Sequence, residues 1–274
     1  DIDKTVEISS IQGGYSNAIK QLNKFIQVGY QDYAKYRSDP SKEASSQLSP
    51  YFHSGQISTH EVFDKISELE SWSPESINPK MVGRREGWWG SSENFESFMD
   101  ELITWRELGY HTCVRRANYN QYSSLPEWAI KTLHEHSSDE REHIYSLDEL
   151  TYSQTHDEIW NAAQNQLRTQ GVIQNYLRML WGKKILEWTP NPQIALSYMI
   201  TLNDRYSLDG RDPNSYSGVF WILGRYDRAW GPERSIFGKI RYMTSDSTAR
   251  KFNLKPYLEK WGNESVGVPT SILK

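Results

Sequence analysis

The apolar residues of this chain recur mostly at spacings of three and four, the period of an amphipathic helix. Helical spacing, or the start and stop signals of a helix, marks residues 14–36, 95–108, 126–134, 157–170, 172–188 and 193–203. Strict alternation flanked by turns, which is typical of strands, is almost absent. We therefore expect an all-α fold in one compact helical domain over residues 15–262. Residues 1–14 are predicted to be a linker or tail, and residues 263–274 a C-terminal tail.

Polar or turn-rich segments separate these helices. Residues 37–50 are rich in Ser, and residues 72–92 hold two Pro and three Gly. Residues 109–125 are irregular and rich in Tyr, and residues 208–214 contain Asp, Gly, Pro and Asn. These compositions predict loops, and the segment 72–92 is long enough to have a role of its own.

Composition excludes several classes of protein. The 274 residues include a single cysteine, Cys113, so neither a disulfide framework nor a cysteine-based zinc site is expected, and a reducing compartment fits best. The sequence contains no apolar run long enough to span a membrane, and its first residues do not resemble a signal peptide. His134, Glu135, His136 and His143 could suggest a metal, but a polar helix end is the favoured interpretation, and we expect no metal site.

Charge and tryptophan content are both unusual. Residues 1–159 carry 15 Lys and Arg against 26 Asp and Glu, whereas residues 160–274 carry 16 against 9. The basic half suits a surface that binds a polyanion, although two solvated surfaces of opposite sign are equally compatible. There are eleven Trp, and Trp181 and Trp188 are seven residues apart, so they share one face of a helix. Such residues usually form a core, but indole rings in a row also suit electron transfer.

A series of ordered motifs runs along most of the chain. It comprises residues 48–51, 101–108, 155–157, 160–164 and 176–188, then Leu202-Asn203-Asp204-Arg205-Tyr206, Leu208-Asp209-Gly210-Arg211-Asp212-Pro213-Asn214, Trp221, Asp227-Arg228-Ala229-Trp230 and Gly238-Lys239-Ile240-Arg241-Tyr242-Met243. Together these motifs resemble class II cyclobutane pyrimidine dimer DNA photolyases, from about residue 15 to about residue 260. The resemblance implies the all-α catalytic domain of that family. We expect the α/β antenna domain that precedes it to be absent, and no antenna chromophore.

The resemblance also implies that this domain binds FAD, whose reduced form is the active one. Residues that match the family's phosphate-binding segment are Tyr33, Ser45, Ser46, Leu48 and Ser49, with Arg106 as a weaker candidate. Residues that match those around the flavin ring are Arg178, Asp209, Asn203, Gly210 and Asn214, with Asn203 facing the flavin N5 atom. Without the resemblance, the Ser-rich segment would be an ordinary loop and Asn203 a helix cap.

Photolyases are a standard example of enzymes that flip a base out of the duplex. In this family the flavin gives an electron to the flipped dimer, the cyclobutane ring splits, and the electron returns. By the resemblance, Glu101 hydrogen-bonds the dimer in a protonated or proton-sharing form. The expected walls and floor of the dimer pocket are Trp105, Trp221, Asn175 and Met179, and the expected DNA contacts are Arg37, Arg228, Trp230 and Arg241. The basic run 225–241, which also includes Arg225, suits phosphate contacts.

The family further implies a photoreduction chain, with Trp181 as the first donor to the flavin, then Trp160 and Trp188, and Tyr145 as an extension. The resulting prediction is a monomeric, light-dependent DNA-repair lyase. It would act on double-stranded DNA that contains cyclobutane pyrimidine dimers, in a bacterial nucleoid or a nucleus. Three alternatives stay open: a cryptochrome-like flavin light sensor, an FAD-binding relative that has lost repair, and a helical interaction domain without a cofactor.

Overall fold

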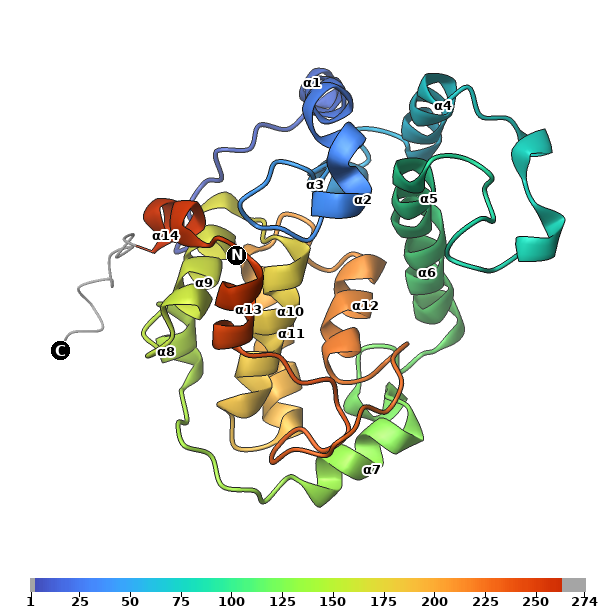
Figure 1. The fold of residues 1–274 in the computed structure, drawn as a ribbon. Helices are drawn as coiled ribbons and strands as arrows, with labels where there is room; N and C mark the ends of the chain where they lie inside the picture. The colour runs from blue at the N-terminus through green and yellow to red at the C-terminus, as the bar shows by residue number, and fades with distance from the viewer. Residues whose placement is uncertain (1–2, 263–274) are drawn as a thin grey trace. The chain divides into compact units, whose positions relative to one another are not determined.

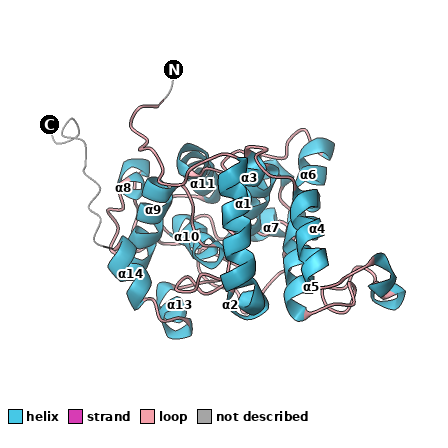
Figure 2. Cartoon of the chain, turned by 90° about the horizontal axis from the view of Figure 1, so that it is seen from above, coloured by secondary structure: helices cyan, strands magenta, loops and turns pink. Residues whose placement is uncertain are grey.

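A computed structural model describes residues 3–262 of the chain; the predicted tail 263–274 lies outside this range. The described residues form helices and loops and no strand, as Figure 2 shows, apart from one isolated antiparallel bridge between Arg234 and Gly238. The predicted all-α fold is therefore confirmed. Among these residues, no helix combines the length and apolarity that a membrane crossing needs.

The chain divides into two compact units, and each is described here by itself. One unit comprises residues 11–114, and the other comprises residues 3–10 together with 115–262. We call them the N-terminal unit and the C-terminal unit. The predicted boundaries at residues 14 and 262 stay predictions.

The N-terminal unit is built from short helices around an aromatic core. Its elements are α1 (Tyr15–Lys24), η1 (Phe25–Gly29), η2 (Tyr30–Asp32), α2 (Tyr33–Tyr36), α3 (Ser49–His53), α4 (Thr59–Leu69), η3 (Pro74–Ser76), η4 (Pro79–Met81), α5 (Glu93–Met99), η5 (Asp100–Trp105) and α6 (Arg106–Arg115). The predicted helical stretch 14–36 is thus four helical segments in succession, of α, π, 3-10 and α type. Phe98 packs against Phe25 and Tyr33, with ring centroids 5.2 and 5.3 Å away.

Two elements of this unit, η1 and η5, are π-helical turns inside longer helical stretches. Such wide turns are frequent at functional sites, and η5 carries Glu101 and Trp105. The helix then continues through α6 to Arg115, so the prediction of irregular structure from residue 109 was wrong for residues 109–115. Because Gly109 is the only buried residue of α6, the sequence of this helix carries no apolar stripe that would predict it.

The C-terminal unit contains the longer helices. Its elements are η6 (Tyr122–Ser124), α7 (Glu127–Glu135), α8 (Leu147–Thr151), α9 (Glu158–Gln170), α10 (Asn175–Glu187), α11 (Pro192–Tyr206), α12 (Pro213–Ile222), α13 (Ser245–Lys251) and α14 (Lys255–Trp261). The ends of these helices follow the signals in the sequence. Asp157 caps α9 by accepting the Trp160 N–H, and α9 ends at Gly171, whose φ of 77° favours glycine. Asn191 caps α11, and Pro192 is its first residue.

The centre of this unit is α10, which packs against α9, α11 and α12 (Figure 1). Eight of its thirteen residues are buried, among them Leu177, Trp181 and Ile185. The close approach to α12 depends on Gly182, because a Cβ atom there would lie 2.1 Å from the Cδ1 atom of Ile222. The helix is therefore fixed on several sides, and its side chains are held in one register.

One charged residue of α10 is fully buried. Lys183 is 1% exposed, and its ammonium donates a hydrogen bond to the Ile222 carbonyl. Burial lowers the pKa of Lys183 to about 7, against an opposing effect of Asp227 and a smaller lowering effect of Arg241. Folding therefore releases a proton that the unfolded chain keeps up to its ordinary pKa of 10.5.

A pH-dependent contribution to stability follows from Lys183. Between pH values of about 7 and 10.5 the unfolded state binds more protons, so the free energy of unfolding should rise with pH in this window. The variant Lys183→Met should lose this rise. Urea unfolding of both proteins across the window measures the difference, and parallel pH profiles of the two proteins would contradict the assignment.

The packing of α10 against α12 gives a second prediction. Gly182→Ala should lower the free energy of unfolding by about 1–3 kcal/mol, because buried side chains must move to admit the new methyl group. Gly218→Ala in α12 is the matched control, since a Cβ atom there meets nothing within 4 Å. It should be neutral or stabilising by about 0.5–1 kcal/mol. Urea unfolding tests both, and equal midpoints would show that α10 and α12 do not approach so closely.

Candidate functional site

A polar network joins α10, α11 and the loop that follows α11. Arg178 on α10 donates to the Asn203 Oδ1 atom on α11 at 2.6 Å, and it lies 3.9 Å from the Asp209 carboxylate. The Asn203 amide donates to the Ser215 hydroxyl on α12, and the Ser207 hydroxyl donates to Asp209. The structure therefore brings together three residues that the sequence assigned to a flavin ring.

This network is mostly withdrawn from solvent. Asn203 is 2% exposed, and the side chains of Arg178 and Asp209 are 17% and 19% exposed. A partly buried guanidinium needs an opposite charge or several acceptors, and Asp209 and Asn203 supply both. What remains exposed is a small part of the Arg178 guanidinium and of the Asp209 carboxylate, which offer a donor and an acceptor to a ligand edge.

The other two predicted ring contacts lie next to this network. Gly210 is in the turn after α11, where a Cβ atom would come within 2.9 Å of the Ser207 carbonyl oxygen. Asn214 is exposed in the first turn of α12, and its N–H donates to the capping Asp212. Gly210 thus allows a tight turn, and the Asn214 side chain makes none of the contacts that hold the network together.

A row of aromatic residues begins one turn away from Arg178. Trp181 follows Arg178 by three residues, and its indole N–H donates to Gln164 Oε1 at 2.8 Å. The Trp160 indole N–H donates to the Trp181 carbonyl at 3.0 Å, and the Trp160 ring lies 5.7 Å from that of Trp188. The three tryptophans are between 0% and 2% exposed. Their order in space is Trp181, Trp160, Trp188, which the sequence left open for the last two.

The row continues toward solvent. The Trp188 ring lies 5.4 Å from that of Tyr145 and 5.2 Å from that of His156. Tyr145 is half-buried, His156 is exposed, and the His156 ring lies 4.0 Å from that of His143. The sequence analysis placed His143 in a candidate metal cluster and gave His156 no role. Only their proximity in the fold links them to the aromatic row.

In the N-terminal unit, two residues assigned to the substrate and DNA form an ion pair. Arg37, which follows α2, donates to the Glu101 carboxylate of η5. The guanidinium also lies 5.8 Å from the centre of the Tyr33 ring. Burial would lower the pKa of Arg37, but Glu101 and Tyr33 outweigh it and raise the pKa. Burial, followed by the charge of Glu101, raises the pKa of Tyr33. Tyr33 therefore stays a neutral hydroxyl.

The remaining predicted residues of this unit are separate from that ion pair. The Trp105 indole N–H donates to Asp100 at 3.0 Å. Arg106 contacts Glu107 at 2.7 Å and lies over the Tyr110 ring. In the Ser-rich segment, Ser45 and Ser46 are half-buried and Ser49 is exposed, while Leu48 is buried before α3. Gln47 adopts φ 55°, so the backbone turns sharply there.

The basic run 225–241 separates into two groups. Arg228 and Arg241 are exposed and flank the Trp230 ring, with guanidinium carbons 4.7 and 5.1 Å from its centre. Arg225, in contrast, is 5% exposed, stacks over Phe220, and donates to the Tyr119 carbonyl at 2.7 Å and to the Ser124 hydroxyl. The prediction that the whole run suits phosphate contacts was therefore wrong for Arg225, which ties η6 to the end of α12.

The predicted pocket residues of the C-terminal unit lie on two helices. Asn175 is exposed at the start of α10, and Met179 is half-buried one turn later. Trp221 is half-buried near the end of α12, with the Tyr226 ring 6.2 Å away. The contacts described here leave the proposed roles of these three residues untested.

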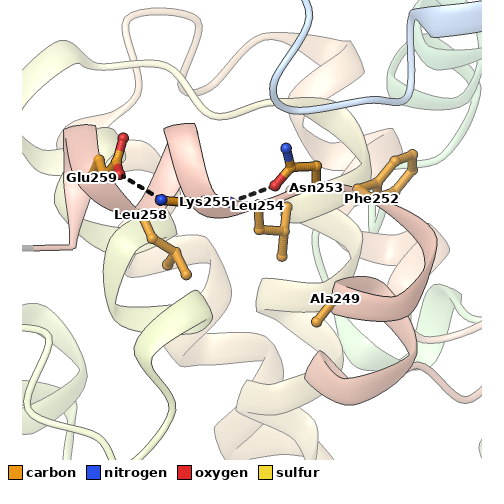
Figure 3. Close-up of a pocket in the computed structure, with 7 residues that line it drawn as sticks. All are labelled: Ala249, Phe252, Asn253, Leu254, Lys255, Leu258 and Glu259. Atoms are coloured by element: carbon orange, nitrogen blue, oxygen red, sulfur yellow. Dashed lines mark hydrogen bonds and ion pairs between the residues drawn. The ribbon is translucent and has the colours of Figure 1, made fainter.

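A pocket between α13 and α14 contains none of the predicted residues. Its lining includes Ala249, Leu254 and Leu258, with the ion pair of Lys255 and Glu259 at its edge (Figure 3). Within residues 3–262, no three His, Cys, Asp or Glu side chains come together as metal ligands. The polar network and the aromatic row are therefore the features of the C-terminal unit that carry site chemistry.

The chain is similar to curated proteins over most of its length. It is 41% identical over 255 residues to deoxyribodipyrimidine photo-lyase of Methanothermobacter thermautotrophicus, a match that covers 93% of this chain and 52% of that protein. It is 38% identical over 261 residues to deoxyribodipyrimidine photo-lyase of Potorous tridactylus, which covers 94% of this chain and 46% of the relative. The chain spans about half the length of these relatives. No family model matches it.

The chain is thus similar to deoxyribodipyrimidine photo-lyases over most of its own length.

Solved structures agree with this similarity at the level of fold. A bacterial class III photolyase from Agrobacterium tumefaciens aligns with a TM-score of 0.64 at 18% identity, covering 90% of this chain and 44% of the other. A cryptochrome from Synechocystis sp. PCC6803 aligns with a TM-score of 0.65 at 15% identity, covering 95% of this chain and 47% of the other. Because identity is low, these likenesses establish the helical fold and nothing about activity.

Arg225 provides a test of the division within the basic run. Arg225→Met should lower the free energy of unfolding by about 1–3 kcal/mol, because buried acceptors at Tyr119 and Ser124 lose their donor. Arg228→Met, at an exposed position three residues on, should change it by less than about 0.5 kcal/mol. Urea unfolding compares the two. If both variants are as stable as the parent protein, Arg225 is not the tie described here.

Proposed function

We propose that this chain is the catalytic part of a class II cyclobutane pyrimidine dimer photolyase, which binds FAD and repairs DNA in light. The observation that carries the proposal is the continuity of the Arg178–Asn203–Asp209 network with the row Trp181, Trp160 and Trp188 on adjoining helices. A redox cofactor needs both a polar cradle and a route for electrons. The relatives named deoxyribodipyrimidine photo-lyase, at 38–41% identity, support the repair reaction.

The residues of the network fit a flavin ring. Arg178 offers guanidinium N–H donors, and the Asp209 carboxylate nearby balances its charge. A flavin ring that gains negative charge would therefore lie beside a fixed cation. Asn203 is held by Arg178 and Ser215, and its amide presents no net charge. When bound, reduced FAD supplies the light-driven electron that splits the dimer and takes it back afterwards.

The proposed phosphate contacts belong to the N-terminal unit. The hydroxyls of Ser45, Ser46 and Ser49, with the backbone at Leu48, offer donors to a pyrophosphate, and Tyr33 adds a neutral hydroxyl. Arg106 remains the weaker candidate, because Glu107 and Tyr110 already engage its side chain. Gly210 and Asn214 are proposed to add backbone and amide contacts.

The proposed substrate contacts start from the Arg37–Glu101 ion pair. Arg37 donates a hydrogen bond to the Glu101 carboxylate, so the two side chains hold each other in place. Glu101 is proposed to hydrogen-bond the dimer in a protonated or proton-sharing form, and Arg37 is proposed as a further donor to a dimer carbonyl that gains negative charge. Trp105, Trp221, Asn175 and Met179 are proposed to line the dimer pocket.

The proposed DNA surface is the group of Arg228, Trp230 and Arg241. Two exposed guanidinium groups beside a half-buried indole suit a backbone phosphate next to an unstacked base. Binding through such cations should weaken as salt rises. We further propose that the protein acts as a monomer on double-stranded DNA, in a nucleoid or a nucleus.

A cryptochrome-like light sensor is the second candidate. One observation favours it: residues of this chain are 48% identical over 50 residues to cryptochrome-2 of Arabidopsis thaliana, although this match covers 18% of the chain. The match to the photo-lyase of Methanothermobacter thermautotrophicus covers 93% of this chain, about five times as much, so repair is the better supported proposal.

Direct repair tests the proposal. The protein is loaded with FAD, chemically reduced, mixed with DNA that contains thymine dimers, and irradiated; the return of base absorbance measures repair. We expect repair in light and none in the dark. A protein that binds FAD but leaves the dimers intact would be a sensor or a relative without repair, and a protein that binds no FAD would overturn the proposal.

The aromatic row gives a separate prediction for photoreduction. Trp181→Phe should abolish light-driven reduction of bound oxidised FAD, because the first donor next to the Arg178 network is lost. Repair by chemically reduced protein should remain. Trp261→Phe is the control, since Trp261 belongs to the same buried cluster but lies outside the row. Absorbance of the flavin under illumination measures the effect, and normal photoreduction in Trp181→Phe would argue against this route.

A further inference from the structure

The surface end of the aromatic row holds a hydrogen-bonded tyrosine and histidine. The Tyr145 hydroxyl and the His156 Nδ1 atom are 2.7 Å apart, and the backbone N–H of His156 donates to the same hydroxyl oxygen at 3.1 Å. The phenol can donate its proton to Nδ1 while its oxygen accepts the backbone N–H. This arrangement needs a neutral imidazole with its own proton on Nε2.

Both rings touch Trp188, the last tryptophan of the row. Its ring centre is 5.4 Å from Tyr145 and 5.2 Å from His156, and the Tyr145 N–H donates to the Trp188 carbonyl at 3.0 Å. The phenol is therefore held against the indole by a backbone bond on one side and by His156 on the other. A tyrosine that is only a surface residue would need neither of these two hydrogen bonds.

The groups around His156 keep it neutral. Burial is the largest cause that lowers the pKa of His156, followed by His143, with a smaller effect of Lys184 in the same direction. Asp157 and Glu142 oppose this lowering but do not reverse it. This lowering favours the neutral ring, and its Nδ1 atom lies within the distance at which a general base takes a proton.

We propose that His156 is the proton acceptor that makes Tyr145 the terminal electron donor of the aromatic row. This inference rests on the proposed photoreduction function. One electron moves from Tyr145 to the oxidised Trp188 indole, while the phenol proton moves to His156 Nδ1. The products are a neutral tyrosyl radical, a restored Trp188 and an imidazolium. The oxidant is light-excited oxidised FAD, to which an electron from Trp188 would pass through Trp160 and Trp181.

Transfer of the phenol proton to His156 favours electron transfer from Tyr145 to Trp188 over its reverse. An oxidised phenol that keeps its proton is a strong acid, so without a base the electron would return to the tryptophan. With the proton on His156, the positive charge leaves the buried row and moves to an exposed ring that faces Asp157 and Glu142. The hole is then separated from the flavin by the full length of the row, which slows its return.

Electron paramagnetic resonance after illumination of the FAD-loaded protein tests the proposal. The parent protein should give a tyrosyl signal that is lost in Tyr145→Phe and in His156→Phe, where a tryptophan signal replaces it. His143→Phe should keep the tyrosyl signal, because His143 contacts His156 but not the phenol oxygen. Added imidazole should restore the signal in His156→Gly, a result that a purely structural role of His156 would not give.

A second arm separates this inference from the proposed function. In flavin-free protein, a soluble ruthenium photo-oxidant should oxidise the half-buried Tyr145, and His156→Phe should lose that yield. A tyrosyl signal of parental size in His156→Phe, in either arm, would overturn the inference and leave photoreduction intact. Loss of all radicals in the FAD-loaded arm, with a His156-dependent tyrosyl signal in the flavin-free arm, would overturn photoreduction and retain the inference.

Discussion

Burial of α10 on several sides is the constraint on which the C-terminal unit depends. This helix packs against α9, α11 and α12, and the contact with α12 needs Gly182. Eight of its thirteen residues are buried, so a polar side chain on a buried side of the helix must find a partner. Lys183 finds the Ile222 carbonyl, and Arg178 finds Asn203 and Asp209. The polar network is thus a consequence of burial as much as a preparation for a ligand.

The same constraint fixes the tryptophans. The indole N–H groups of Trp160 and Trp181 both donate to buried acceptors, so neither ring can turn without losing a hydrogen bond in an apolar environment. Ring positions held in this way suit electron transfer, because the route depends on distance and small movements are excluded. A core made only of aliphatic residues would be equally compact but would offer no such route.

Among the helices that the sequence predicted, α9 and α11 also carry clear end signals. Asp157 and Gly171 mark α9, and Asn191 with Pro192 marks the start of α11. Helix α6 was missed in part because Gly109 is its only buried residue. Arg225 was misread because a charge run in a sequence does not show which side chain is buried. The family resemblance named Tyr145, but the role of His156 depends on a contact across eleven residues that no local pattern encodes.

The two ends of α10 therefore carry different chemistry at a fixed separation. Arg178 and Trp181 lie in its first half, and Trp188 follows its last residue, seven positions and about 10 Å beyond Trp181 along the axis. Trp160 on α9 bridges that interval, with its indole N–H on the Trp181 carbonyl and its ring against Trp188. The length of α10 thus sets how far a positive charge must travel from the polar network to the surface. Tyr145 and His156 stand where that path first reaches solvent, which is where a proton can leave as well.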